Sequence, residues 1–158
     1  MTNNKNQLVE QFPAILPLAV QWAEAQETLI LKEGVPLSAQ GLSDAKLMGV
    51  ANPEKIRLLK VSHVPMPVHP VLMQAAQATG LISPNTGGMA IRYGIFVRHD
   101  CWTNRRLIAH ECVHTSQYER FGGIKQFLER YLRECVEIGY PAAPLEQEAV
   151  QGESKILG

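Results

Sequence analysis

The sequence has 158 residues, of which 46% are hydrophobic, which is enough for the core of one domain. Fifteen basic and fifteen acidic residues balance one another, and no basic block stands out, so the composition argues against a nucleic-acid or anionic-membrane binder. No apolar run approaches the roughly 18 residues of a membrane span, and the start of the sequence lacks a signal-peptide pattern. The three cysteines (Cys101, Cys112 and Cys135) lack the number and spacing of a disulfide framework or a Cys-rich zinc site. We therefore expect a single cytoplasmic domain over residues 1–158.

The hydrophobic pattern predicts a mainly helical α+β chain with five or six helices and two to four strands. Apolar residues at helical spacing predict a long helix over residues 12–32, after a polar segment over residues 1–7 that we expect to be disordered. Trp22 lies on the apolar stripe of this helix, where an aromatic side chain more often belongs to the core than to a ligand site. The later elements are bounded by Gly, Pro or capping residues. They are a short helix capped by Ser43 and closed by Gly49, strands over 56–64 and 89–99, and helices over 71–78, from Thr103 or Asn104 to Phe121, over 124–138, and from Pro144 onward.

The stretch from Leu107 to Gln117 carries the strongest chemical signal. It contains His110, Glu111 and His114 in the spacing HExxH. On a helix, two histidines four residues apart project from one face and can converge on one cation. Glu111 lies about 100° around the axis, where it can reach a water molecule without being a ligand. The surrounding residues are apolar, so unpaired His and Glu would be costly to bury, and metal binding explains them. The alternative is a pair of core histidines that are satisfied by hydrogen bonds.

A zinc hydrolase also needs a third protein ligand. The extended metzincin motif requires Gly at position 117 and His at position 120, where this sequence has Gln117 and Arg120. A deformylase-like cysteine ligand fits poorly, because Cys101 is only nine residues ahead of His110 and no earlier cysteine exists. A carboxylate from a downstream helix, which gives a His₂Glu site, therefore remains.

With HExxH and a later glutamate, the chain resembles the gluzincin-type zinc metallopeptidases over roughly residues 91–150. In that superfamily the third ligand is often a Glu followed three residues later by Ala, and Glu146 with Ala149 matches this pattern. Several such families have Asp after the Ala, where this chain has Val150, so the carboxylate that would support the ligands from that position is missing. Glu148 is the reserve ligand. The resemblance implies a zincin-like fold with a small sheet beside the motif helix.

The resemblance also implies the activity of a zinc-dependent peptidase acting on a peptide or protein substrate. His110, His114 and Glu146 would hold Zn²⁺, and Glu111 would be the general base that takes a proton from the attacking water. In such enzymes the strand before the motif helix is commonly the sheet edge that pairs with an extended substrate. An internal strand without a role in substrate binding is an equal alternative.

A non-catalytic binding or scaffold module that retains a metal site is the alternative function. It stays open because the chain leaves little sequence for a separate substrate domain. An open cleft at the metal would favour the enzyme, whereas a closed site with four protein ligands would favour a structural role. His99, Tyr118 and Tyr140 could each donate a hydrogen bond to an oxyanion, although packing is the expected role of each.

Overall fold

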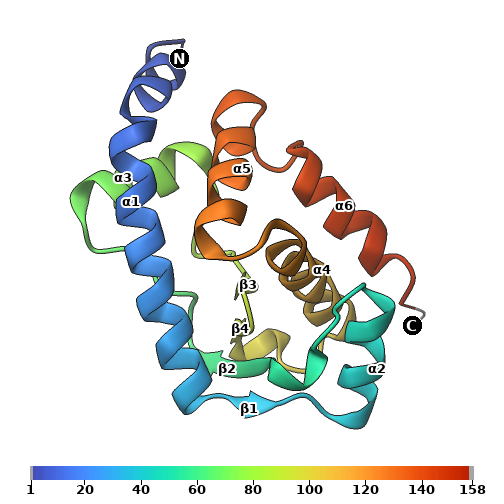
Figure 1. Cartoon of the computed structure of the whole chain (residues 1–158). Helices are drawn as coiled ribbons and strands as arrows, with labels where there is room; N and C mark the ends of the chain where they lie inside the picture. The colour runs from blue at the N-terminus through green and yellow to red at the C-terminus, as the bar shows by residue number, and fades with distance from the viewer. Residues whose placement is uncertain (1, 157–158) are drawn as a thin grey trace.

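The computed structural model describes residues 2–156. Within that range the chain is a mainly helical α+β fold with six α-helices and one four-stranded sheet, as predicted (Figure 1). No helix in this range is long and apolar enough to cross a membrane. The helices are α1 (Thr2–Glu33), α2 (Ala39–Leu47), α3 (Pro70–Thr79), α4 (Arg105–Phe121), α5 (Ile124–Glu137) and α6 (Pro144–Glu153), with short 3₁₀ turns η1 (Pro53–Lys55) and η2 (His99–Cys101). The strands are β1 (Val35–Pro36), β2 (Arg57–Val61), β3 (Gly88–Ile91) and β4 (Gly94–Arg98).

The sheet has the order β1-β2-β4-β3, and its inner strand β4 is buried on both faces. β2 and β4 are parallel, while β1 and β3 are antiparallel to their neighbours. Because side chains alternate along a strand, Ile95 and Val97 of β4 pack in one core with α2 and α4, and Phe96 packs in another with α1 and α5. Figure 1 shows α1 along one side of the molecule, α2 and α6 on the other, and α4 between them. Strand β3 packs directly against α4, so the sheet supports the motif helix.

The predicted strand over residues 89–99 is in fact a hairpin. β3 and β4 are joined by a turn in which Arg92 has the left-handed φ of 54°. Glu27 of α1 stabilises this turn: it accepts hydrogen bonds from the Arg92 guanidinium at 2.6 and 2.8 Å and from the Tyr93 N–H at 3.1 Å. The strand immediately before the motif helix is therefore internal, and β3 is the sheet edge beside α4.

The first helix is longer than predicted. α1 begins at Thr2, so the expectation of disorder over residues 1–7 is wrong for residues 2–7, while residue 1 lies outside the described range. Pro13 and Pro17 lie inside the helix and are exposed, so water can reach the carbonyl groups that they leave unpaired. Phe12 and Ile15 are buried, and α1 packs along α5. This tertiary contact maintains the helix through both prolines.

Other predicted boundaries agree within a few residues, with two corrections. Ser38, and not Ser43, caps α2, because its hydroxyl accepts a hydrogen bond from the Gly41 N–H at 3.1 Å. The helix predicted over residues 124–138 ends at Glu137, and Ile138 lies just beyond it with 56% of its surface exposed. The predicted strand over 56–64 and the helices over 71–78, 124–138 and from Pro144 are present.

Glu119 of α4 connects the motif helix to two loops. Its carboxylate accepts hydrogen bonds from the Ala51 N–H at 2.8 Å, from the Tyr93 hydroxyl at 2.8 Å, and from both the backbone and the side chain of Asn52. Burial raises the pKa of Glu119, but these hydrogen bonds outweigh burial and lower the pKa below its ordinary value.

The three cysteines are free thiols. Cys112 and Cys135 are buried, and burial raises the pKa of each thiol to about 12, whereas Cys101 is half-buried. The two buried thiols therefore act as small apolar core groups.

Candidate metal centre

The HExxH residues lie on α4, which has well-defined ends. Asn104 caps its start by accepting a hydrogen bond from the Leu107 N–H at 3.1 Å, as predicted for one of two candidate caps. Gly122 ends it with a φ of 98°, a left-handed conformation that favours glycine. Between these ends His110 and His114 project from the same face, toward α6.

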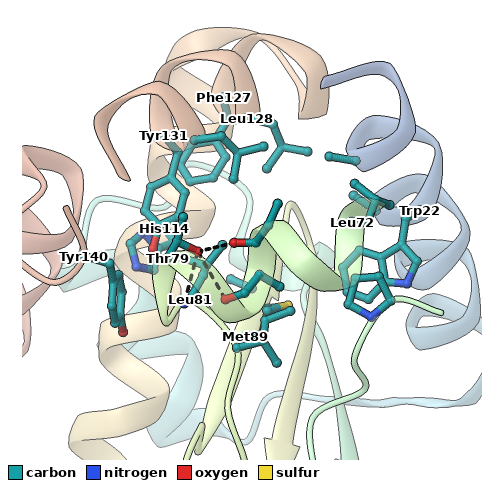
Figure 2. A pocket seen from close by; sticks show the side chains of 18 of the residues that line it. Trp22, Leu72, Thr79, Leu81, Met89, His114, Phe127, Leu128, Tyr131 and Tyr140 are labelled. Atoms are coloured by element: carbon teal, nitrogen blue, oxygen red, sulfur yellow. Dashed lines mark hydrogen bonds between the residues drawn. The ribbon is translucent and has the colours of Figure 1, made fainter. Parts of the chain in front are cut away.

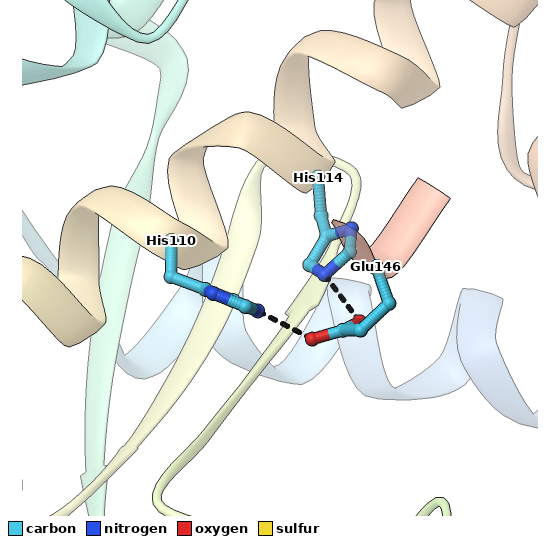
Figure 3. Close-up of side chains that lie close together, drawn as sticks. All are labelled: His110, His114 and Glu146. Carbon is cyan, nitrogen blue, oxygen red and sulfur yellow. Dashed lines mark hydrogen bonds and ion pairs between the residues drawn. The ribbon is translucent and has the colours of Figure 1, made fainter. Parts of the chain in front are cut away.

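Glu146, in the first turn of α6, lies between the two imidazoles (Figure 3). Its Oε1 is 2.6 Å from His110 Nε2, and its Oε2 is 3.0 Å from His114 Nε2. One ligand atom from each of the three residues can be chosen so that all lie within 4.8 Å of one another. The structure therefore brings together the three residues that the sequence suggested as metal ligands.

Glu148, the reserve ligand, lies elsewhere. Its carboxylate is 44% exposed and pairs with Arg120 at 2.9 Å, while Gln117 Nε2 donates to it at 3.0 Å. Of the two glutamates, only Glu146 faces both histidines.

Three outer residues that the sequence did not reveal hold the cluster in place. Glu153 Oε1 lies 2.9 Å from His110 Nδ1, Gln117 Oε1 lies 2.8 Å from His114 Nδ1, and the Tyr131 hydroxyl donates to Glu146 Oε2 at 2.9 Å. Such partners fix the orientation of an imidazole and leave its other nitrogen facing the site. The support that Val150 cannot give to the ligands thus comes from Glu153, Gln117 and Tyr131.

Glu111 lies beside the cluster but is not one of the three residues that could hold a metal. Its side chain is 7% exposed, and its Oε1 accepts a hydrogen bond from the Ala90 N–H of β3 at 3.0 Å. Burial raises the pKa of Glu111, and the two nearby histidines only partly oppose this effect. Strand β3 therefore positions the predicted general base.

Burial and hydrogen bonding shift the pKa values of His110, His114 and Glu146 in opposite directions. Burial lowers the pKa of His110, but the hydrogen bond with Glu146 and the nearby carboxylates raise it to about 9, and the same effects raise the pKa of His114. Burial raises the pKa of Glu146, but the hydrogen bonds with both histidines hold it well below its usual range. The metal-free cluster thus favours an ionised Glu146 against protonated imidazoles, and metal binding would release protons.

An open cleft of about 600 Å³ reaches this cluster from solvent. His110, Glu111 and Glu146 line it together with Tyr140 and residues of the 80–88 segment. This segment lies against α4: a Cβ at Gly87 would be only 2.6 Å from Leu107 Cδ1. The cluster is therefore open to solvent on this side and not closed by protein.

The donor atoms suit a metal ion. Two imidazole nitrogens and one carboxylate oxygen form a common catalytic zinc site, in which tetrahedral ligands about 2.0–2.1 Å from the metal lie roughly 3.3 Å apart. The separations of 2.6 and 3.0 Å are shorter than that spacing, so Glu146 would move slightly away from the two imidazoles to admit an ion, and the cluster could hold a metal. Comparisons with family models, curated proteins and solved structures found no match to this chain. The resemblance to gluzincins therefore rests on HExxH and Glu146.

The three candidate oxyanion donors have different surroundings. Tyr118 is 2% exposed, and its hydroxyl donates to the Ala90 carbonyl at 3.2 Å, which is a packing role. His99 is exposed at the end of β4. Tyr140 lines the open cleft together with Glu146, and burial raises the pKa of its hydroxyl group. Of the three, Tyr140 is the one that lines the cleft.

Proposed function

We propose that this protein is a zinc-dependent metallohydrolase that cleaves peptide bonds, with Glu111 as its general base. The observation that supports this proposal is the meeting of His110, His114 and Glu146 at an open cleft, with Glu111 beside them. A catalytic zinc site has three protein ligands and an accessible remaining position, and the cleft meets the second requirement.

The residues of the chain would divide the work as follows. A bound Zn²⁺ would supply a Lewis acid and lower the pKa of a water molecule. Glu111 would accept the proton of the attacking water and deliver it to the leaving amine. Its buried position supports this role, because burial raises the pKa of the carboxyl group and so favours the protonated form that the proton transfer creates. The Ala90 N–H would keep the carboxylate in place during this transfer.

The test is hydrolysis of a library of quenched fluorescent peptides by the zinc-loaded protein. We expect Glu111→Gln to retain zinc and lose about 10²- to 10⁴-fold in rate, because it removes the base and no ligand. Glu129→Gln is the matched control, since it alters an exposed carboxylate of α5 outside the cluster and should retain both zinc and activity. Full activity in Glu111→Gln would contradict the assignment.

A non-catalytic binding module is the second candidate, and one observation favours it. In the described part of the chain, every buried side-chain nitrogen or oxygen has a hydrogen-bond partner, so the cluster is satisfied without a metal. A protein of this kind would keep the shape of the site and bind a partner with or without zinc. It would hydrolyse no peptide of the library, and Glu111→Gln would leave the partner binding unchanged.

A further inference from the structure

A second, more enclosed cavity of about 160 Å³ adjoins the same cluster (Figure 2). His110, Glu111 and Glu146 line both this cavity and the open cleft. Figure 2 shows His114 and Tyr140 at one side of the cavity and Trp22 at the opposite side. The cavity therefore extends from the proposed reaction centre into the interior of the fold.

The walls of the cavity are apolar. They come mainly from α1, α3 and α5, and Trp22, Leu72 and Leu128 are typical of the side chains that face it. Among the described lining residues, ionisable Asp, Glu, Lys, Arg and His side chains occur only in the cluster with Glu111. The hydroxyl of Thr79 donates within its own helix, to the Ala75 carbonyl at 2.9 Å. A charged group would find no oppositely charged side chain along these walls, whereas an apolar group would lose its contact with water.

The size of the cavity limits its occupant. An apolar cavity of about 150 Å³ lined by aliphatic and aromatic side chains stays dry and binds benzene. The present cavity, of about 160 Å³, therefore has room for one phenyl-sized or branched aliphatic group. An apolar group that lies against these walls leaves water and therefore binds with a gain. Trp22, which was expected to be plain core, is half-buried and forms part of this wall.

We propose, building on the proposed function, that this cavity is the specificity pocket of the enzyme. It takes one large apolar side chain, aromatic or aliphatic, of the substrate residue next to the bond that is cleaved. Residues of α1, α3 and α5 thus select the substrate, while α4 and α6 supply the reacting groups. The occupant is a peptide side chain and not a long acyl chain, because the volume accommodates a single ring.

Hydroxamic acids, which bind zinc directly, test this proposal without turnover. In calorimetric titrations of the zinc-loaded wild type, 3-phenylpropanohydroxamic acid should bind roughly 10- to 100-fold more tightly than acetohydroxamic acid, which is the gain expected for burial of a phenyl group. Equal affinities would overturn the proposal. Tightest binding of decanohydroxamic acid would also overturn it, in favour of an acyl chain.

Two variants of α3 test whether the gain in hydroxamate affinity from the phenyl group arises in this cavity. Ala75 lines the cavity and Ala78 is exposed on the same helix, so Ala75→Phe fills the cavity and Ala78→Phe makes the same change outside it. Ala75→Phe should lose the gain from the phenyl group, and Ala78→Phe should retain it, with thermal denaturation as a check that each variant folds. Loss of the gain in both variants or in neither would contradict the assigned position.

The metal-free protein separates this proposal from the proposed function. Toluene should raise the Tm of the wild type and of Ala78→Phe, but not that of Ala75→Phe, because it stabilises only a protein with an open cavity. If toluene has no effect on Tm while hydroxamates bind, the specificity-pocket proposal is wrong and the zinc site is supported. If toluene binds and no hydroxamate does, the substrate assignment falls together with the proposed function.

Discussion

The contact between α4 and α6 predicts an unusual response to the substitution Gly152→Ala. A Cβ at Gly152 would lie 2.6 Å from Val113 Cγ2, whereas carbon atoms pack at about 3.5–4.0 Å. The two helices must therefore separate by about 1 Å, and such overpacking costs about 1–3 kcal/mol. Alanine in a helix gains about 1 kcal/mol over glycine, so we expect a net loss of about 1 kcal/mol in the free energy of unfolding.

The variant Val113→Ala reverses the sign of this effect. It removes the methyl group that meets the new Cβ, so Gly152→Ala should stabilise the Val113→Ala protein by up to about 1 kcal/mol. Urea denaturation of the wild type, both single variants and the double variant measures this coupling. An increase in stability from Gly152→Ala in the wild-type background would refute the argument that the glycine permits close packing of α6 on α4.

Three further predictions concern single residues. Glu153→Ala should weaken zinc binding about 10- to 100-fold in a competition titration, because His110 loses its orienting partner. Substitution of the exposed Gln151 by Ala should leave the zinc affinity unchanged. Equal affinities of the two variants would exclude the orienting role of Glu153. Glu119→Gln should destabilise the fold by about 1–3 kcal/mol at pH 7. Because the folded-state pKa of Glu119 is lowered, its contribution is complete above about pH 4.3 and disappears as the pH falls through the folded value, so denaturation curves of the two proteins should converge in acid. In native protein at pH 8 a thiol reagent should label Cys101 alone, and all three cysteines after denaturation; rapid labelling of three in the native state would contradict the described burial.

The local patterns of the sequence were enough to predict the motif helix and its candidate ligands. Asn104, the HExxH spacing and the two glycines after Phe121 are signals that operate within a few residues. Glu146 was suggested by its own spacing to Ala149, and the structure places it against both histidines. The helix count and the small sheet followed from the same kind of local periodicity.

The features that the sequence did not reveal depend on contacts between distant elements. The turn at Arg92 lacks the usual Asn-Gly signal and is held by Glu27 from α1, so the hairpin was taken as one strand. Glu153 reaches His110 because α6 packs closely on α4, and the apolar cavity exists only where α1, α3 and α5 meet. Gln117 is the exception, because its spacing three residues after His114 could have indicated its contact.

The most direct test of the metal site is elemental analysis of the protein purified without chelator, in parallel with Glu146→Ala and Glu148→Ala. The arrangement of His110, His114 and Glu146 predicts about one zinc per chain in the wild type and in Glu148→Ala, and loss of zinc in Glu146→Ala. No metal in the wild type, even after incubation with zinc, would contradict the metal site, and the hydrolase proposal would fail with it.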